Sequence, residues 1–223
     1  YLERFVYGLS EWYGADIQGA DLVANPGCLA TGAQLAVLPL AKLPVAVTSL
    51  AVDCLTGSSG AGAKPTATTH HPWRAHTMQA YSPIGHRHTA EVASSWQRMT
   101  GQKPPPMSFV PHRTPLVRGI LTTAHCFCEA PVDEEAVRDL FAEVYCDQPF
   151  VRLLPPDQTP HVSAVWGSNR CDLAVRAQGR AIVVMGAIDN LMKGAAGQAI
   201  HNVNLMYGWV PDCGLDAPMP LIV

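Results

Sequence analysis

The sequence predicts a mixed α/β fold in which helices flank a largely antiparallel sheet. Two observations lead to this prediction. A short strand, a tight turn and an alanine-rich helix follow one another near the start of the chain, and several strand candidates cluster in its second half. We find no repeat, heptad or low-complexity tract in this order of elements, so a globular protein is expected.

Composition argues against several classes of protein. The chain has 223 residues, of which 48% are hydrophobic, and a formal net charge of −3 that is spread without blocks. This charge gives no reason to expect a nucleic-acid or membrane partner. No apolar run approaches the roughly 20 residues of a membrane span. Seven cysteines without regular spacing are typical of a reducing compartment, and we expect a cytoplasmic location.

Cys28 stands where the first strand, expected over residues 20–24, meets the first helix, expected over 28–43. The turn between them is Asn25-Pro26-Gly27. Unpaired amides at a helix N-terminus favour an anion, so we expect the pKa of this thiol to fall. Cys28 is therefore a candidate covalent nucleophile. The alternative is a buried cysteine that acts as a small apolar residue.

A glycine-rich loop, residues 56–64, follows the buried strand that we expect over residues 45–55. Glycines in this loop, among them Gly60 and Gly62, permit the close approach of a ligand. Its amides could accept a phosphate or the flat edge of a cofactor. The histidine-rich residues 66–76, interrupted by a proline, predict a second loop.

Two histidines and an arginine precede the next helix, which we expect over residues 89–99. His86 or His88 can act as a general acid or base near neutral pH, and Arg87 can bind an anionic group. Glu91 follows His88 by about one helical turn and can orient its imidazole. The alternative is a solvated start of a helix that is capped by Thr89.

A metal site is not expected from the histidines. They are numerous between residues 70 and 88, but their spacing matches no structural or catalytic zinc motif. A zinc hydrolase is accordingly the weaker alternative for this cluster.

The second half of the chain supplies the remaining elements. A proline-rich linker is expected over residues 101–106, helices over 133–146 and 190–208, and strands over 107–110, 119–129, 162–166, 172–176 and 180–186. Gly194 and Gly197 inside the last helix predict close packing against another surface. Asn190 and Lys193 at its start could reach a ligand.

Five stretches resemble the N-acetyl-γ-glutamyl-phosphate reductase family, within the glyceraldehyde-3-phosphate and aspartate-semialdehyde dehydrogenase superfamily. They are ANPGC at 24–28, SGAG at 59–62, HRHTAE at 86–91, VRGIL at 117–121 and DNLMKGAAGQA at 189–199. The stretches follow the family order over nearly the whole chain. The histidine-rich segment looks closer to the branch that reduces carrier-protein-bound aminoadipyl or glutamyl phosphate. The implied fold is the α+β catalytic domain of the glyceraldehyde-3-phosphate dehydrogenase type.

The resemblance implies NADPH-dependent reduction of an acyl phosphate to a semialdehyde in arginine or lysine biosynthesis. Cys28 would form a thioester, His88 would be the acid and base, and Glu91 would steer it. His86, the rival base, and Arg87 would bind substrate. The resemblance further implies contacts with the nicotinamide side of NADP from the residues Ser59, Gly60, Gly62 and Asn190.

Two departures from the family pattern shape the expected organisation. Leu29-Ala30 replace the usual aromatic residue and proline, and no glycine-rich dinucleotide fingerprint is present. We therefore expect residues 1–27 to end a nucleotide-binding region, 28–188 to form the catalytic and dimerisation domain, and 189–223 to pack on the nucleotide-binding domain. The expected partners are an acyl phosphate or an acidic carrier protein, and a second copy in a homodimer or homotetramer.

Two alternative functions stay open at this stage. The chain could be an inactive catalytic-domain fragment that serves only in dimerisation and substrate binding. It could also be an enzyme of the aspartate-semialdehyde dehydrogenase type, with the same chemistry on another acyl phosphate.

Overall fold

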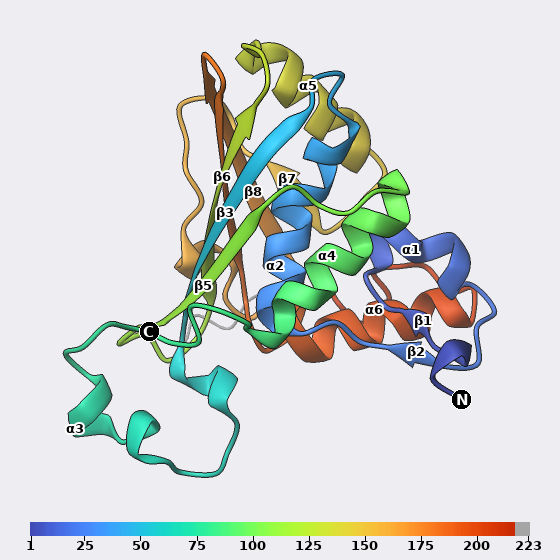
Figure 1. Ribbon diagram of the computed structural model, residues 1–223. Coiled ribbons are helices and arrows are strands. Elements are labelled where there is room, and N and C mark those ends of the chain that lie inside the picture. The colour runs from blue at the N-terminus through green and yellow to red at the C-terminus, as the bar shows by residue number, and fades with distance from the viewer. Residues whose placement is uncertain (217–223) are drawn as a thin grey trace.

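The computed structural model describes residues 1–216 as one seven-stranded sheet with helices against it and a two-stranded parallel sheet near the N-terminus (Figure 1). The strand order of the large sheet is β4-β5-β3-β6-β9-β8-β7. Within residues 1–216, no helix combines the length and the apolar character needed to cross a membrane.

The elements alternate along the chain as follows. The strands are β1 Val6–Tyr7, β2 Val23–Ala24, β3 Val47–Thr56, β4 Gln79–Ala80, β5 Met107–Arg113, β6 Ile120–Cys128, β7 Val151–Leu153, β8 Cys171–Gln178 and β9 Ala181–Ile188. The α-helices are α1 Ser10–Ile17, α2 Cys28–Val37, α3 His71–Arg74, α4 Arg87–Thr100, α5 Glu134–Tyr145 and α6 Gly197–Met206.

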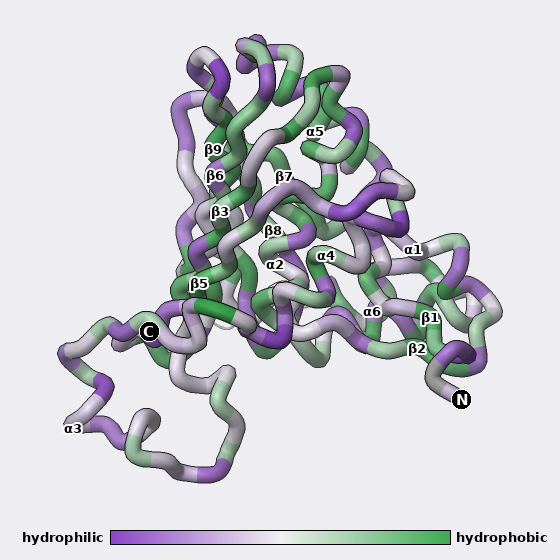
Figure 2. The backbone as a smooth tube through the Cα atoms, viewed as in Figure 1, coloured by the Kyte–Doolittle hydropathy of each residue, from purple (hydrophilic) through white to green (hydrophobic). Residues whose placement is uncertain are grey.

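The prediction of a mixed, largely antiparallel sheet is confirmed. β6 pairs antiparallel with β3 and β9, and β8 with β9, whereas β5 and β7 pair parallel with their neighbours β3 and β8. Hydrophobic residues run along these strands (Figure 2). Helix α2 is buried from Leu29 to Val37, because its alanines and Gly32 allow it to lie close to β6.

The structure corrects several expected elements. The helix expected over 28–43 ends at Val37, and a 3₁₀ helix with a proline in its first turn continues over Leu38–Lys42. Residues 162–166 form a 3₁₀ helix, Val162–Val165, instead of a strand. The side chain of Val162 packs against Gly119, and the side chain of Val165 is buried.

Several short elements that the structure contains were not expected from the sequence. Helix α1 and strands β1 and β7 were not predicted, because their apolar residues follow no clear period. The loop expected over 66–76 contains a 3₁₀ turn, Ala67–Thr69, and α3. The last helix begins with a π-helix, Met192–Ala196, before it continues as α6.

A buried ion pair joins α1 to the π-helix, 182 residues apart in the sequence. Glu11 of α1 accepts a hydrogen bond from the Lys193 ammonium of the π-helix, and neither side chain is exposed. His201 of α6 lies 3.7 Å from the same carboxylate oxygen, and burial lowers the pKa of this imidazole to about 4. Lys193 is thus a structural residue, and the expectation that it reaches a ligand is wrong.

Replacing Glu11 with Gln should lower the free energy of unfolding by about 3–5 kcal/mol, because it leaves the Lys193 charge buried and unpaired. Urea unfolding followed by circular dichroism measures the effect. The double variant Glu11→Gln/Lys193→Met should regain most of the loss. Asp16→Asn, which breaks the exposed Arg98–Asp16 pair, is the control and should cost under about 1 kcal/mol. If Glu11→Gln and Asp16→Asn lowered the free energy of unfolding by the same amount, this account would be wrong.

Candidate functional site

A pocket of about 560 Å³ lies where α2 and α4 begin. Its lining includes Cys28, His86, Arg87, His88 and Gly60, so five of the residues expected in a site share one cavity. These residues come from three separate segments of the chain. The fold therefore brings together the start of α2, the glycine-rich loop and the start of α4.

Cys28 is the first residue of α2, as predicted, and its side chain is partly buried. A Cβ added to Gly194 of the π-helix would lie 2.7 Å from Cys28 Cβ, so only glycine fits there. This contact confirms the close packing predicted for the last helix and holds the thiol at the pocket.

The pKa of Cys28 is raised, contrary to the prediction from its helix N-terminal position. Burial is the main cause, because it disfavours the charged thiolate. Hydrogen bonds from the amides of Leu29 and Cys28, and then the charge of Arg87, lower the pKa only in part. The thiol is therefore protonated at neutral pH and needs a base to become a nucleophile.

His88 lines the same pocket as Cys28 and is itself buried, at 3% exposure. Its ring packs so closely on Gly27 that a Cβ there would overlap Nε2. Burial lowers the pKa of His88 to about 4, so the imidazole is neutral at pH 7. Nε2 accepts a hydrogen bond of 3.4 Å from Arg87 Nε. A neutral imidazole with Nε2 as acceptor can take a proton.

Glu91 is fixed by contacts that the sequence did not predict. One carboxylate oxygen accepts hydrogen bonds from the Tyr7 hydroxyl at 2.6 Å and from Gly27 N at 3.0 Å. The other lies 3.8 Å from His88 Nε2. Gln34 donates to the same Tyr7 hydroxyl at 2.7 Å. Tyr7 is separated from Glu91 by 84 residues, and no local pattern signals such a pairing.

His86 has a different environment from His88. It precedes α4 as its N-cap, where Nδ1 accepts from His88 N at 3.3 Å, and its ring stacks on Phe109. The expectation that Thr89 caps this helix is wrong, because α4 begins two residues earlier. His86 thus orders the backbone that carries Arg87 and His88.

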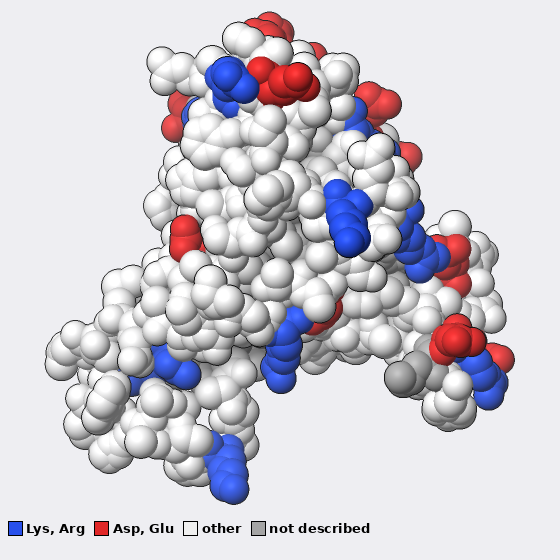
Figure 3. Space-filling view, in the orientation of Figure 1, with Lys and Arg blue, Asp and Glu red and all other residues white. Residues whose placement is uncertain are grey.

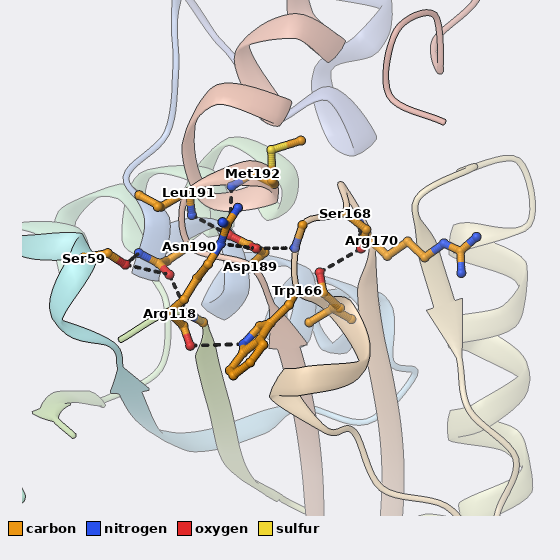
Figure 4. A network of polar contacts seen from close by, with 12 residues as sticks. Ser59, Arg118, Trp166, Ser168, Arg170, Asp189, Asn190, Leu191 and Met192 are labelled. Carbon is orange, nitrogen blue, oxygen red and sulfur yellow. Dashed lines mark hydrogen bonds and ion pairs between the residues drawn. The ribbon is translucent and has the colours of Figure 1, made fainter. Parts of the chain in front are cut away.

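Asp189 and Asn190 organise the far side of the site (Figure 4). Asp189 is fully buried and accepts from Arg118 Nε and from three backbone amides, those of Gly167, Leu191 and Met192. Asn190 accepts from Gly119 N at 2.6 Å and donates to Ser59 Oγ at 3.0 Å. Asp189 therefore holds the backbone where the π-helix begins, and Asn190 joins the glycine-rich loop to the start of β6.

The amides of the glycine loop are largely engaged within the protein. Ser58 N and Ser59 N donate to the carbonyls of Leu116 and Val117, and Gly62 N donates to Ser59 O. Gly60 lines the pocket, whereas the amides of Ser58, Ser59 and Gly62 already have acceptors within the protein. Among residues 1–216, no group of three or more His, Cys, Asp or Glu side chains is arranged to hold a metal ion.

Residues 28–190 match the family described as semialdehyde dehydrogenase, dimerisation domain. The chain belongs to this family. The matched residues of this semialdehyde dehydrogenase dimerisation domain run from the candidate nucleophile to the asparagine that contacts Ser59.

Curated relatives confirm the resemblance seen in the sequence. The chain is 42% identical over 217 residues to N-acetyl-gamma-glutamyl-phosphate reductase of Methanopyrus kandleri, and 46% identical over 218 residues to that of Methanosarcina acetivorans. These alignments cover 97% and 96% of the chain but 62% and 63% of the relatives, so the chain spans less than two thirds of their length.

Solved structures support the fold alone. Aspartate semialdehyde dehydrogenase II of Vibrio cholerae, in complex with ASA, is similar with a TM-score of 0.71 at 18% sequence identity. The match covers 92% of this chain and 68% of that one. The predicted fold class, an α+β semialdehyde dehydrogenase domain with a mixed sheet, is thereby confirmed.

Alkylation of Cys28 by iodoacetamide should speed up with pH and show a midpoint above that of a free cysteine, about 8.5, because burial raises the pKa. Arg87→Gln should move the midpoint higher, since the arginine charge lowers this pKa. Mass spectrometry of the Cys28 peptide measures the rate. Arg98→Gln, on the same helix, is the control. A wild-type midpoint below about pH 8 would contradict the assignment.

Proposed function

We propose that this chain carries the catalytic part of an NADPH-dependent reductase that converts N-acetyl-γ-glutamyl phosphate, or the carrier-bound aminoadipyl or glutamyl phosphate, to its semialdehyde. The observation that carries the proposal is that Cys28 and His88 line one pocket, where the His88 ring packs on Gly27, the residue before Cys28. The names of the relatives favour the N-acetylglutamyl substrate, and hence arginine biosynthesis. The unpaired state of all seven cysteines is compatible with a cytoplasmic enzyme.

The first step is acylation of Cys28. His88 takes the thiol proton as the sulfur attacks the acyl carbon; a carbon–sulfur bond forms, the carbon–oxygen bond to phosphate breaks, and phosphate leaves. Arg87 donates to His88 and lies in the pocket, where its charge stabilises the departing phosphate. Glu91, held by Tyr7, keeps the loop at Gly27 and the imidazole in place.

The bound NADPH would supply a hydride to the thioester carbon. His88, having taken a proton from the thiol, returns it to the sulfur as the carbon–sulfur bond breaks, which releases the aldehyde. The residues present fit the nicotinamide end of the cofactor: Gly60 lines the pocket, and a Cβ there would lie 3.5 Å from Thr56 and 3.6 Å from Asn190, so glycine leaves this room to a ligand. Ser59, Gly62 and Asn190 would border that room.

We further propose the domain division expected from the sequence, with residues 28–188 as the catalytic and dimerisation unit and 1–27 as the end of a nucleotide-binding region. Residues 189–223 would pack on the nucleotide-binding domain, and exposed Tyr207, Trp209 and Val210 support this. The last part of that segment, 217–223, lies outside the described residues.

A homo-oligomer would form through the outer face of the sheet. Helices α2 and α4 lie on one side of the sheet (Figure 1), whereas residues on the other side are only partly buried. Cross-strand pairing places these side chains on that face: Leu55, Leu121, Phe127, Val183 and Met185. A second copy of the chain would cover them.

Acylation can be tested on the chain as it stands. Mixing it with N-acetyl-γ-glutamyl phosphate should release phosphate and add the acyl mass to the Cys28 peptide, measured by mass spectrometry. Cys28→Ser should abolish the thioester, and His88→Gln should slow its formation by about 10²–10⁴-fold. Cys146→Ser, at an exposed cysteine outside the pocket, is the control. Acylation that survives Cys28→Ser would overturn the proposal.

Oligomerisation is tested by sedimentation equilibrium. Val183→Glu should convert the assembly to a smaller species, because it buries a charge in the proposed interface. Gln97→Glu, at an exposed position of α4 on the opposite side of the sheet, should leave the mass unchanged. A wild-type monomer at micromolar concentration would contradict the interface.

A further inference from the structure

Two arginines that the sequence did not single out, Arg74 and Arg113, line the same pocket as Cys28. Arg74 belongs to the short helix α3, and Arg113 ends strand β5. The described residues that line the pocket include three arginines and two histidines but no Asp or Glu. The surface over α3 and the neighbouring loop likewise shows basic and no acidic side chains on the face in view (Figure 3).

Arg74 is held rigidly without a carboxylate partner. It is 6% exposed, and it donates from Nε to Thr114 O at 2.9 Å and from Nη2 to Thr56 O at 3.0 Å. Burial lowers the pKa of Arg74, and the nearby charge of Arg113 lowers it further. A buried guanidinium bound only to neutral carbonyls is unfavourable unless an anion completes its environment.

Arg113 is also positioned by neutral groups. Its guanidinium lies 4.3 Å from the centre of the Tyr81 ring, and Nη1 donates to Gln79 Oε1 at 3.3 Å. Tyr81 is close enough to Cys28 for the two groups to influence each other: burial raises the pKa of its hydroxyl, a thiolate at Cys28 raises it further, and Arg113 and Arg74 lower it in part. The two arginines therefore lie near each other and near Tyr81, in the cavity that holds the thiol.

Like charges held close together repel each other, and among the described residues no carboxylate lines the pocket beside these two arginines. The arrangement is that of a preorganised anion site. Arg87 marks the reacting end of the pocket, because it donates to His88 and its charge acts on Cys28. Arg74 and Arg113 are thus left for a second negative group of the same ligand.

We propose that Arg74 and Arg113 form a subsite for the α-carboxylate of an N-acylglutamyl or similar amino-acid substrate, and so determine substrate specificity. This inference rests on the proposed function and deepens it. An acyl phosphate of this kind carries two anions, the phosphate at the reacting carbon and the carboxylate at the other end of a short carbon chain. The rigid forks of the two arginines bind the carboxylate, while the phosphate lies beside Arg87.

Calorimetric titration of the full chain tests the subsite with three probes. N-acetyl-L-glutamate has the α-carboxylate, 4-acetamidobutyrate is the same molecule without it, and inorganic phosphate stands in for the leaving group. The wild type should bind N-acetyl-L-glutamate about 10- to 100-fold more tightly than 4-acetamidobutyrate. Arg113→Gln should remove this preference and leave phosphate affinity unchanged, and Arg113→Lys should restore part of it.

Arg74→Gln should have the same effect as Arg113→Gln, and a thermal melt shows whether it remains folded; Arg113→Gln carries the test if it does not. Arg180→Gln, whose side chain bonds to Cys128 O at the far end of the sheet, is the matched control. Equal affinity of the wild type for the two acyl probes, or no binding of N-acetyl-L-glutamate, would overturn the subsite. So would a variant that loses phosphate affinity and keeps the preference for the carboxylate.

The outcome is separable from that of the proposed function. Acylation of Cys28 without any carboxylate preference would reject the subsite alone. A carboxylate preference in a chain whose Cys28 is never acylated would reject the reductase activity and leave the anion site in place.

Discussion

One buried carboxylate, that of Asp189, fixes the geometry on which the site depends. It has no exposed surface, yet it accepts from Arg118 and from the amides of Gly167, Leu191 and Met192. These contacts join the end of β9 to two loops and to the start of the π-helix. Because that helix presents Gly194 to Cys28, the position of the thiol follows from how the carboxylate is satisfied.

The electrostatics of the pocket favour a neutral thiol and a neutral imidazole over a preformed ion pair. Burial acts on both groups in the direction that removes charge, raising the pKa of Cys28 and lowering that of His88. In the proposed reaction a proton must therefore move when the acyl group arrives. This would couple formation of the nucleophile to substrate binding, and the raised pKa makes the thiol slow to react with oxidants and alkylating reagents at neutral pH.

The sequence predicted the fold class, the strand–turn–helix at Cys28 and the packing at Gly194, because each depends on local pattern or on residue size. It could not predict the Glu11–Lys193 pair, Tyr7 as the support of Glu91, or Arg74 and Arg113 in the pocket. Each of these joins segments far apart in the chain, and no periodicity reports such contacts. The pKa of Cys28 moves opposite to the prediction because burial of the thiol outweighs the helix terminus, and that burial involves Gly194, which is distant in the sequence. The catalytic and substrate-binding roles stay predictions, as do the cofactor contacts of Ser59, Gly60, Gly62 and Asn190.

The pairing of α1 with the π-helix and α6 has a consequence for biosynthesis. Gln198 and Asn202 both donate to the carbonyl of Gly8, about 190 residues earlier in the chain, and Lys193 reaches back to Glu11. During translation α1 must therefore wait, with an unpaired carboxylate, until residues 193–202 have left the ribosome. Such late closure predicts slow folding that requires protection of the nascent segment around α1.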